Sequence, residues 1–444
     1  MSNPGLTHKR VLRIALPIVL SNATIPILGA VDTAVIGQLG QAAPMGAVAM
    51  GAVILASFYW IFGFLRMGTT GLVAQAHGAG DRAEVSAVLI RALLIGLAAG
   101  LVIVAAQAAL FWAAFKVAPA SPAVEGFAHT YLSVRIWGAP ATIALYAITG
   151  WLIAVERTRS VLVVQVLMNG LNVGLDLWFV LSLGWGVQGV AVATLIAEYS
   201  GLALGLWLCR DALGSAALRD RARIFDAARL ARMLSVNSDI MVRSVVLQGS
   251  FTAFVFLGAG LGDATLAANQ VLMLFVEITA YALDGFAFAA EALVGAAVGS
   301  GARSGVRQAG ILASHWGFGG AVGLALGFWL SGPMIIDLMT TAPEVREIAR
   351  TYLPWLAVAP VIGIASWMLD GIYIGATWTR PMRNAMLQSV AVYAVAVAVL
   401  VPPFGNHGLW AALMVLNIAR AVTLGWRYPA LEGQVQSARP VPTA

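Results

Sequence analysis

Long apolar runs separated by short polar stretches recur along the whole chain of 444 residues. A membrane-spanning helix needs about 20 mostly apolar residues. By that measure the sequence predicts about twelve spans, near 11–36, 47–73, 88–114, 131–154, 161–183, 188–209, 233–258, 266–298, 308–331, 352–376, 386–403 and 408–426. The pattern therefore predicts an all-α, multi-pass membrane protein.

Composition supports this class and excludes others. The chain is 60% hydrophobic and 10% charged, whereas a soluble domain is roughly 25% charged. Its single cysteine excludes a disulfide framework and a multi-cysteine metal site. The five histidines are scattered, and no nucleophile–base pair stands out. We therefore expect neither an enzyme nor a bound cofactor.

The basic charge of the chain predicts its topology. Lys and Arg number 26 against 20 Asp and Glu, for a net charge of +6. The arginines lie mostly in short loops, which favours contact with anionic lipid headgroups over nucleic acid. Alternate loops are rich in Lys and Arg, and these loops lie on the same side as both termini. Both termini are therefore expected on the cytoplasmic side.

An internal repeat relates the two halves of the chain. GLVAQAHGAGDR, from Gly71, resembles ALVGAAVGSGAR, from Ala292, and GWLIAVERTR, from Gly150, resembles GIYIGATWTR, from Gly371. Both pairs are offset by 221 residues, and two further landmarks are offset by 222 and 219. Repeats of this kind are common in transporters.

The repeat predicts the domain organisation. Each half has an even number of predicted spans, so the halves share one orientation and would be related by a pseudo-two-fold axis along the membrane normal. We expect an N-lobe at 1–209 with six helices, a cytoplasmic linker at 210–232 forming an amphipathic interfacial helix, a C-lobe at 233–426 with six helices, and a cytoplasmic tail at 427–444. Two six-helix bundles around a central cavity suit alternating access.

The first span contains an unexpected carboxylate. Asp32 lies near its centre, where aspartate costs about 3 kcal/mol on insertion scales, and such groups usually serve a function. Pro17, in the same span, removes a backbone hydrogen bond and permits a kink. Asp32 is therefore a candidate ion-binding carboxylate.

Comparison of the two halves identifies companions for Asp32. The repeat places Asp32 opposite Phe254, and an offset of 219 places Asn172, Asp176 and Thr194 opposite Ala391, Val395 and Leu413. Asn172 and Asp176 are four residues apart, hence on one helix face. Oxygen ligands of this kind suit an alkali cation or a proton. Hydrogen bonding between helices is the alternative explanation.

Other charged residues in the spans have open roles. Thr194 and Glu198 are four apart, so Glu198 could extend the Asp32 group. Asp370 could carry a second proton, or pair with Arg243 or Arg420.

Two further sets remain, one on the eighth span and one on the seventh. Glu277, Asp284 and Glu291 could line a cavity for cationic substrate, or lie near the cytoplasmic ends or pair with arginines. Asp239 and Arg243 are expected to neutralise each other as an i,i+4 pair.

Five stretches of this chain resemble one transporter family. They are VDTAVIGQLG, FLRMGTTGLVAQAHGAGD, NGLNVGLDLWFVLSLGWGVQGVAVATLIAEY, NSDIMVRSVVLQ and DGIYIGATWTRPMRN. They are similar to the MATE (multidrug and toxic compound extrusion) family, in its DinF-like branch. The resemblance implies twelve helices in two lobes, with an N-lobe cation site at Asp32, Asn172, Asp176 and Thr194 and a kinking proline at Pro17. An acidic pair known from a sister branch is not transferred to Asp239 and Asp370, whose local contexts differ.

The resemblance implies an antiporter in the bacterial inner membrane. Such a protein exports small organic, cationic or amphipathic compounds against an inward flow of H⁺ or Na⁺. The branch favours H⁺, whereas four oxygen-bearing side chains also suit Na⁺. We expect a monomer. The alternative is a lipid-linked precursor flippase, which would favour about fourteen spans and a cationic cavity, whereas the intramembrane excess here is acidic.

Overall fold

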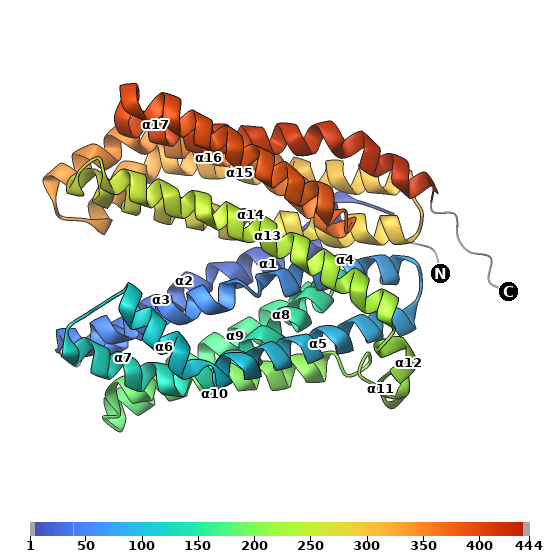
Figure 1. Cartoon of the computed structure of the whole chain (residues 1–444), viewed down its shortest axis with the longest axis horizontal. Helices are drawn as coiled ribbons and strands as arrows, with labels where there is room; N and C mark the ends of the chain where they lie inside the picture. The colour runs from blue at the N-terminus through green and yellow to red at the C-terminus, as the bar shows by residue number, and fades with distance from the viewer. Residues whose placement is uncertain (1–4, 39, 438–444) are drawn as a thin grey trace. The chain divides into compact units, whose positions relative to one another are not determined.

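A computed structural model describes residues 5–38 and 40–437 (Figure 1). Every regular element in these residues is helical. Helices α1–α12 are His8–Ala23, Ile25–Gly37, Ala42–Trp60, Gly63–Gly78, Arg82–Ala105, Gln107–Val117, Pro122–Arg135, Ala139–Ala154, Thr158–Asp176, Gly186–Leu208, Ser215–Arg219 and Arg221–Ile224, with η1 at Ile136–Gly138 and η2 at Leu177–Ser182, counting these two separately. Helices α13–α17 are Ala227–Ala259, Asp263–Gly299, Arg303–Met339, Pro343–Gly375 and Thr379–Ser437.

The helices account for the predicted spans. Ten helical segments in the described residues are long and apolar enough to cross a membrane. The broken pair α1 and α2 adds one crossing. Helix α17 is two helices joined at Gly405, whose φ of 52° and ψ of −127° are not helical, so it counts twice. The predicted twelve crossings and the all-α fold class are confirmed.

The chain forms two compact units. One comprises 1–19, 74–80 and 231–444, and the other comprises 20–73 and 81–230. In the second unit α5 packs on α8, α9 on α10, and α3 on α7. In the first unit α14, α15 and α16 pack on one another, and α16 packs on α17. The core of this unit includes Phe254 against Trp410 and Phe275 against Phe328.

The predicted linker differs from the expected single helix. Two short helices, α11 and α12, occupy it, and α13 begins at Ala227. Asp220 accepts a hydrogen bond from the backbone N–H of Arg223, and Asp226 accepts one from that of Arg229. Each carboxylate caps a new helix and so interrupts the previous one. The predicted tail is also helical as far as Ser437.

An ion pair holds the entrance to this connector. Arg157 donates to both oxygens of Asp211, at 3.1 and 2.6 Å. The hydrogen bonds from this guanidinium hold the pKa of the Asp211 carboxyl below its usual range. The connector is thereby tied to the turn before α9.

The internal repeat is visible in the backbone. Glu156 and Thr377, which are 221 residues apart, are the non-glycine residues with positive φ in the described chain, at 60° and 52°. The next residue donates its N–H five residues back in both halves, Arg157 to Leu152 and Trp378 to Tyr373. Both sequences therefore end a helix by the same turn.

The end of α4 crosses the end of α14 within the first unit. A Cβ atom on Gly78 would lie 2.0 Å from the carbonyl oxygen of Ala296, and one on Gly299 would lie 1.9 Å from that of Gln75. Both relationships are repeated at an offset of 221 residues. Glycine at both positions lets the two backbones approach each other closely.

Replacing Gly299 with alanine should lower stability by about 1–3 kcal/mol, because the added methyl group overlaps backbone atoms that cannot move aside. Gly319→Ala on α15 is the matched control, since nothing lies within 4 Å of a Cβ atom there. The melting temperature of the purified protein in detergent measures the difference. Equal melting temperatures for the two variants would contradict the close crossing.

Candidate functional site

Three helices of the second unit bring four predicted site residues together. Asp32 lies on α2, Asn172 and Asp176 lie on α9, and Thr194 lies on α10, and these three helices contact one another. Asn172 and Asp176 are completely buried, and Thr194 is 8% exposed. The side chains of Asp32 and Asp176 interact by a hydrogen bond.

Hydrogen bonds orient the amide and the hydroxyl of this group. Asn172 Nδ2 donates to Thr194 Oγ1 at 3.0 Å, and Thr194 Oγ1 donates to the backbone oxygen of Val190 at 2.9 Å. The hydroxyl therefore uses its proton on its own helix and accepts the amide N–H. Asn172 Oδ1 is left as an acceptor without a donor. Thr194 thus determines which end of the amide is free.

The carboxylates also lack donors. Both oxygens of Asp176 and Oδ1 of Asp32 are buried and receive no hydrogen bond from a donor group. Two carboxyl groups can hydrogen-bond to each other only when one of them carries a proton. Without that proton, the buried charge requires a cation. The cluster of Asp32, Asn172, Asp176 and Thr194, called here the carboxylate cluster, can therefore hold a proton or a small cation.

The donor set limits which cation could bind. No group of three or more His, Cys, Asp or Glu side chains in the described residues could hold a metal ion. A cation at the carboxylate cluster would take two carboxylates and draw its other ligands from Asn172 and Thr194. Such an all-oxygen set with few charges suits Na⁺ and does not resemble a site for Zn²⁺.

Glu198 lies beside a cation that sequence reasoning missed. Arg135, on α7, donates to both carboxylate oxygens of Glu198, at 2.8 and 2.9 Å. The close approach depends on Gly138, where a Cβ atom would lie 2.1 Å from Glu198 Oε2. Arg135 also interacts electrostatically with Asp32 and Asp176. An arginine in a predicted apolar span was the signal in the sequence.

Pro17 lies inside α1, which continues for six residues beyond it. The helix is interrupted at Thr24, and α2 begins at Ile25. Thr24 Oγ1 donates back to the carbonyl of Ser21 at 2.7 Å. The boundary between the two compact units crosses α1 at Val19 and Leu20, close after Pro17.

The structure corrects two of the counterpart assignments. Helices α9 and α17 begin at Thr158 and Thr379, an offset of 221. At this offset Asn172 corresponds to Tyr393 and Asp176 to Val397. Val395, the predicted counterpart of Asp176, is 64% exposed. The change of offset to 219 therefore falls later, at the π-helical η2, where extra residues are accommodated.

The comparison between the halves still holds after this correction. Phe254, opposite Asp32, and Leu413, opposite Thr194, belong to one buried hydrophobic core with Tyr393. Val397 packs against the same core. The first unit thus fills the corresponding region with apolar and aromatic side chains and no carboxylate.

The first unit has a different buried ionic group. Asp370 Oδ2 accepts hydrogen bonds from Arg243 and from Arg420, the latter at 2.5 Å. Arg420 also donates to Asn417 at 3.1 Å. All three charged side chains are at most 6% exposed. Of the two roles predicted for Asp370, pairing with arginine is what the contacts show.

The predicted pair between Asp239 and Arg243 is wrong. Asp239 accepts instead from Arg383 at 2.7 Å and from Thr379 at 3.1 Å. Residues four apart on a helix can meet, but partners on α16 and α17 offer both groups additional hydrogen bonds.

The three acidic residues of α14 do not share one environment. Glu277 is exposed, Asp284 is half-buried and Glu291 is 1% exposed. The expectation that Glu291 lies nearest an interface is not matched by its burial. Glu277 and Asp284 remain candidates for contact with a cationic substrate.

Comparisons with known proteins agree on one family. The MatE family pattern matches residues 17–178 and 240–400. The chain is 39% identical to DNA damage-inducible protein F of Escherichia coli over 426 residues, covering 95% of this chain and 92% of that protein. It is 27% identical to the probable multidrug resistance protein NorM of Rhizobium meliloti, over 98% and 96% of the two chains.

A solved structure has the same fold. The Vibrio cholerae MATE transporter VcmN in its bent form superposes with a TM-score of 0.87 at 19% identity, covering 97% of this chain and 98% of that one.

Proposed function

The chain belongs to the MatE family of membrane transporters, and on that premise we propose that it is a proton-coupled antiporter that exports small organic, cationic or amphipathic compounds. The observation that carries the proposal is the carboxylate cluster, in which four acceptor oxygens of Asp32, Asn172 and Asp176 lack a donor inside the protein. A resident proton or cation would satisfy them, and a transported one could leave.

The contact between Asp32 and Asp176 supports H⁺ over Na⁺ as the coupling ion. One proton shared between two adjacent carboxyls supplies the missing hydrogen bond without further ligands. Sodium would need about six oxygens at wider separations, as hard alkali and alkaline-earth cations generally do. Asn172 and Thr194 would shape the site in either case. Glu198 would act through Arg135, whose positive charge lies near the pair.

Coupling would operate through α1 and α2. Protonation of Asp32 changes the charge carried by α2 relative to α9, and so changes the relative stability of two arrangements of the broken helix. Pro17 leaves a backbone carbonyl unpaired and lowers the resistance of α1 to bending. The ion can shift this equilibrium only by its difference in affinity for the two states.

The proposed location is the bacterial inner membrane, with both termini in the cytoplasm and the protein acting as a monomer. The loops rich in arginine support this orientation. The predicted lobes, 1–209 and 233–426, would be the two moving bodies. Membrane lipid is the expected surrounding partner, and nucleic acid is not.

The coupling ion can be determined with purified protein in vesicles loaded with an ethidium-like dye. Under a pH gradient alone, dye should move against H⁺ flow, because the shared proton leaves the pair when the driving side is alkaline. Under a Na⁺ gradient alone, with pH clamped by an ionophore, movement should equal that in protein-free vesicles. The reverse pattern would contradict proton coupling and retain the antiporter. Movement under neither gradient would contradict both.

A further inference from the structure

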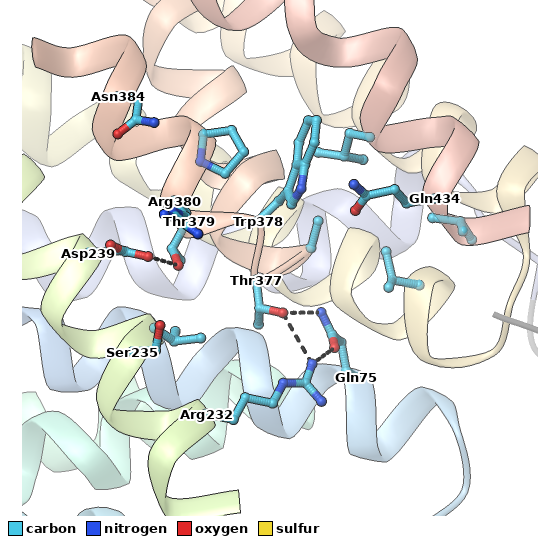
Figure 2. Close-up of a pocket in the computed structure, with 16 residues that line it drawn as sticks. Gln75, Arg232, Ser235, Asp239, Thr377, Trp378, Thr379, Arg380, Asn384 and Gln434 are labelled. Atoms are coloured by element: carbon cyan, nitrogen blue, oxygen red, sulfur yellow. Dashed lines mark hydrogen bonds between the residues drawn. The ribbon is translucent and has the colours of Figure 1, made fainter. Parts of the chain in front are cut away.

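A cavity of about 760 Å³ lies in the first unit, away from the carboxylate cluster. Its walls come from the end of α4, the start of α13, the end of α14, the turn between α16 and α17, and both ends of α17. Figure 2 shows the polar side chains of these elements around the same space.

A hydrogen-bonded clamp forms one wall of the cavity. Gln75 Nε2 donates to the carbonyl of Gly375 at 3.1 Å and to Thr377 Oγ1 at 2.9 Å. Arg232 Nη2 donates to Gln75 Oε1 at 2.9 Å (Figure 2). Thr377 has a φ of 52°, which is uncommon for a side chain branched at Cβ. The clamp therefore stabilises a strained turn, and the partners of Arg232 within it are neutral.

The cavity carries excess positive charge. Asp239, the one acidic side chain lining it, is paired with Arg383 and with Thr379. In the described part of the chain, Arg380 has no hydrogen-bonding or ionic partner. Arg232 and Arg380 thus present two positive charges that no carboxylate of the cavity neutralises.

The apolar part of the lining indicates the depth of the cavity in the membrane. Trp378 and Pro381 line it together with Val298. The turn at 376–378 separates two helical segments that are long and apolar enough to cross a membrane. Tryptophan and arginine at the end of a span are typical of the headgroup region. An anion that also has an apolar part matches this lining better than a small inorganic ion.

We propose that this cavity binds the phosphate of an anionic phospholipid, with Arg380 and Arg232 as its ligands and the acyl chain beginning at Trp378 and Pro381. A guanidinium group can donate two parallel hydrogen bonds to phosphate oxygens. Ser235, Asn384 and Gln434 line the same cavity and supply further polar groups. A lipid bound there contacts α13, the strained turn and the residues that Gln75 clamps, and so stabilises their association.

The repeat supplies a matched control for Arg380. Arg159 lies 221 residues earlier at the start of α9, as Arg380 does at the start of α17, and both side chains are exposed. In the second unit, however, Arg157 replaces Trp378 and is engaged by Asp211. Arg380→Gln and Arg159→Gln therefore remove the same charge at equivalent positions, with and without the cavity.

Native mass spectrometry of the full-length protein in detergent, titrated with phosphatidylglycerol or phosphatidylcholine, tests the proposal. Wild type should retain phosphatidylglycerol over phosphatidylcholine. Arg380→Gln should weaken phosphatidylglycerol retention about tenfold, since a charge-assisted hydrogen bond contributes about 1.5 kcal/mol or more. Arg232→Gln should weaken it similarly, and Arg159→Gln should match wild type.

A second measurement separates lipid from soluble phosphate and guards against misfolding. Phosphatidylglycerol should raise the melting temperature of wild type and of Arg159→Gln, and should raise that of Arg380→Gln by less than half as much. Inorganic phosphate at millimolar concentration should neither raise it nor displace the lipid. Equal losses in Arg380→Gln and Arg159→Gln would overturn the site. Displacement by inorganic phosphate would overturn its assignment to lipid.

Discussion

Asp176→Asn should abolish proton-driven dye export while leaving the protein at least as stable as wild type. The two oxygens of Asp176 are completely buried without a donor, so replacing one by an amide N–H gives Asp32 a permanent hydrogen-bond partner. The same change removes a group that can gain and lose a proton. Efflux from loaded vesicles under a pH gradient measures the first effect, and the melting temperature in detergent measures the second.

Asp32→Asn should abolish efflux in the same way, because either amide prevents sharing of the proton. Asp337→Asn is the matched control, since Asp337 accepts from the exposed side chain of Arg350 at 2.6 Å. Export at the wild-type rate by both Asp32→Asn and Asp176→Asn would exclude the carboxylate cluster from coupling. Loss of export together with a lower melting temperature would show that the cluster serves packing instead.

The second large effect concerns stability of the first unit. Asp370→Asn should lower the free energy of unfolding by about 3–5 kcal/mol, because removing the acidic partner leaves buried arginine charge uncompensated. Arg243 and Arg420 would then face each other around a neutral side chain, where wild type has one negative charge between them.

Arg243→Met provides the contrasting variant for this group. It removes one positive charge and leaves Asp370 paired with Arg420 alone, so that the buried charges balance. Methionine also retains much of the apolar volume of the arginine stem. We therefore expect Arg243→Met to lose less than half as much stability as Asp370→Asn. The order of the two melting temperatures decides the matter, and the reverse order would contradict the charge count.

Much of the fold could be predicted from the hydrophobic pattern. Apolar runs of spanning length can satisfy their backbone groups in hydrocarbon only as helices, so the all-α class and the twelve crossings followed without tertiary information. The repeat was also readable, because Gly78, Gly299, Glu156 and Thr377 lie where backbones approach closely or φ is positive. These local requirements are properties of single residues and their neighbours.

The ion pairs could not be predicted in the same way. An arginine and an aspartate four residues apart on one helix have compatible geometry, yet Asp239 pairs with Arg383 and Arg243 with Asp370. The choice depends on which faces of α13, α16 and α17 meet. That is set by side-chain packing between helices distant in the sequence.

The sequence by itself determined that Asp32, Asn172, Asp176 and Thr194 are polar where hydrocarbon would suffice. Only the tertiary structure decided that Thr194 receives the amide of Asn172, that Asp32 meets Asp176, and that Arg135 neutralises Glu198. The reason is physical. The cost of burying a polar group depends on the residue type and can be read from one chain, whereas its compensation depends on distances of about 3 Å between separate helices.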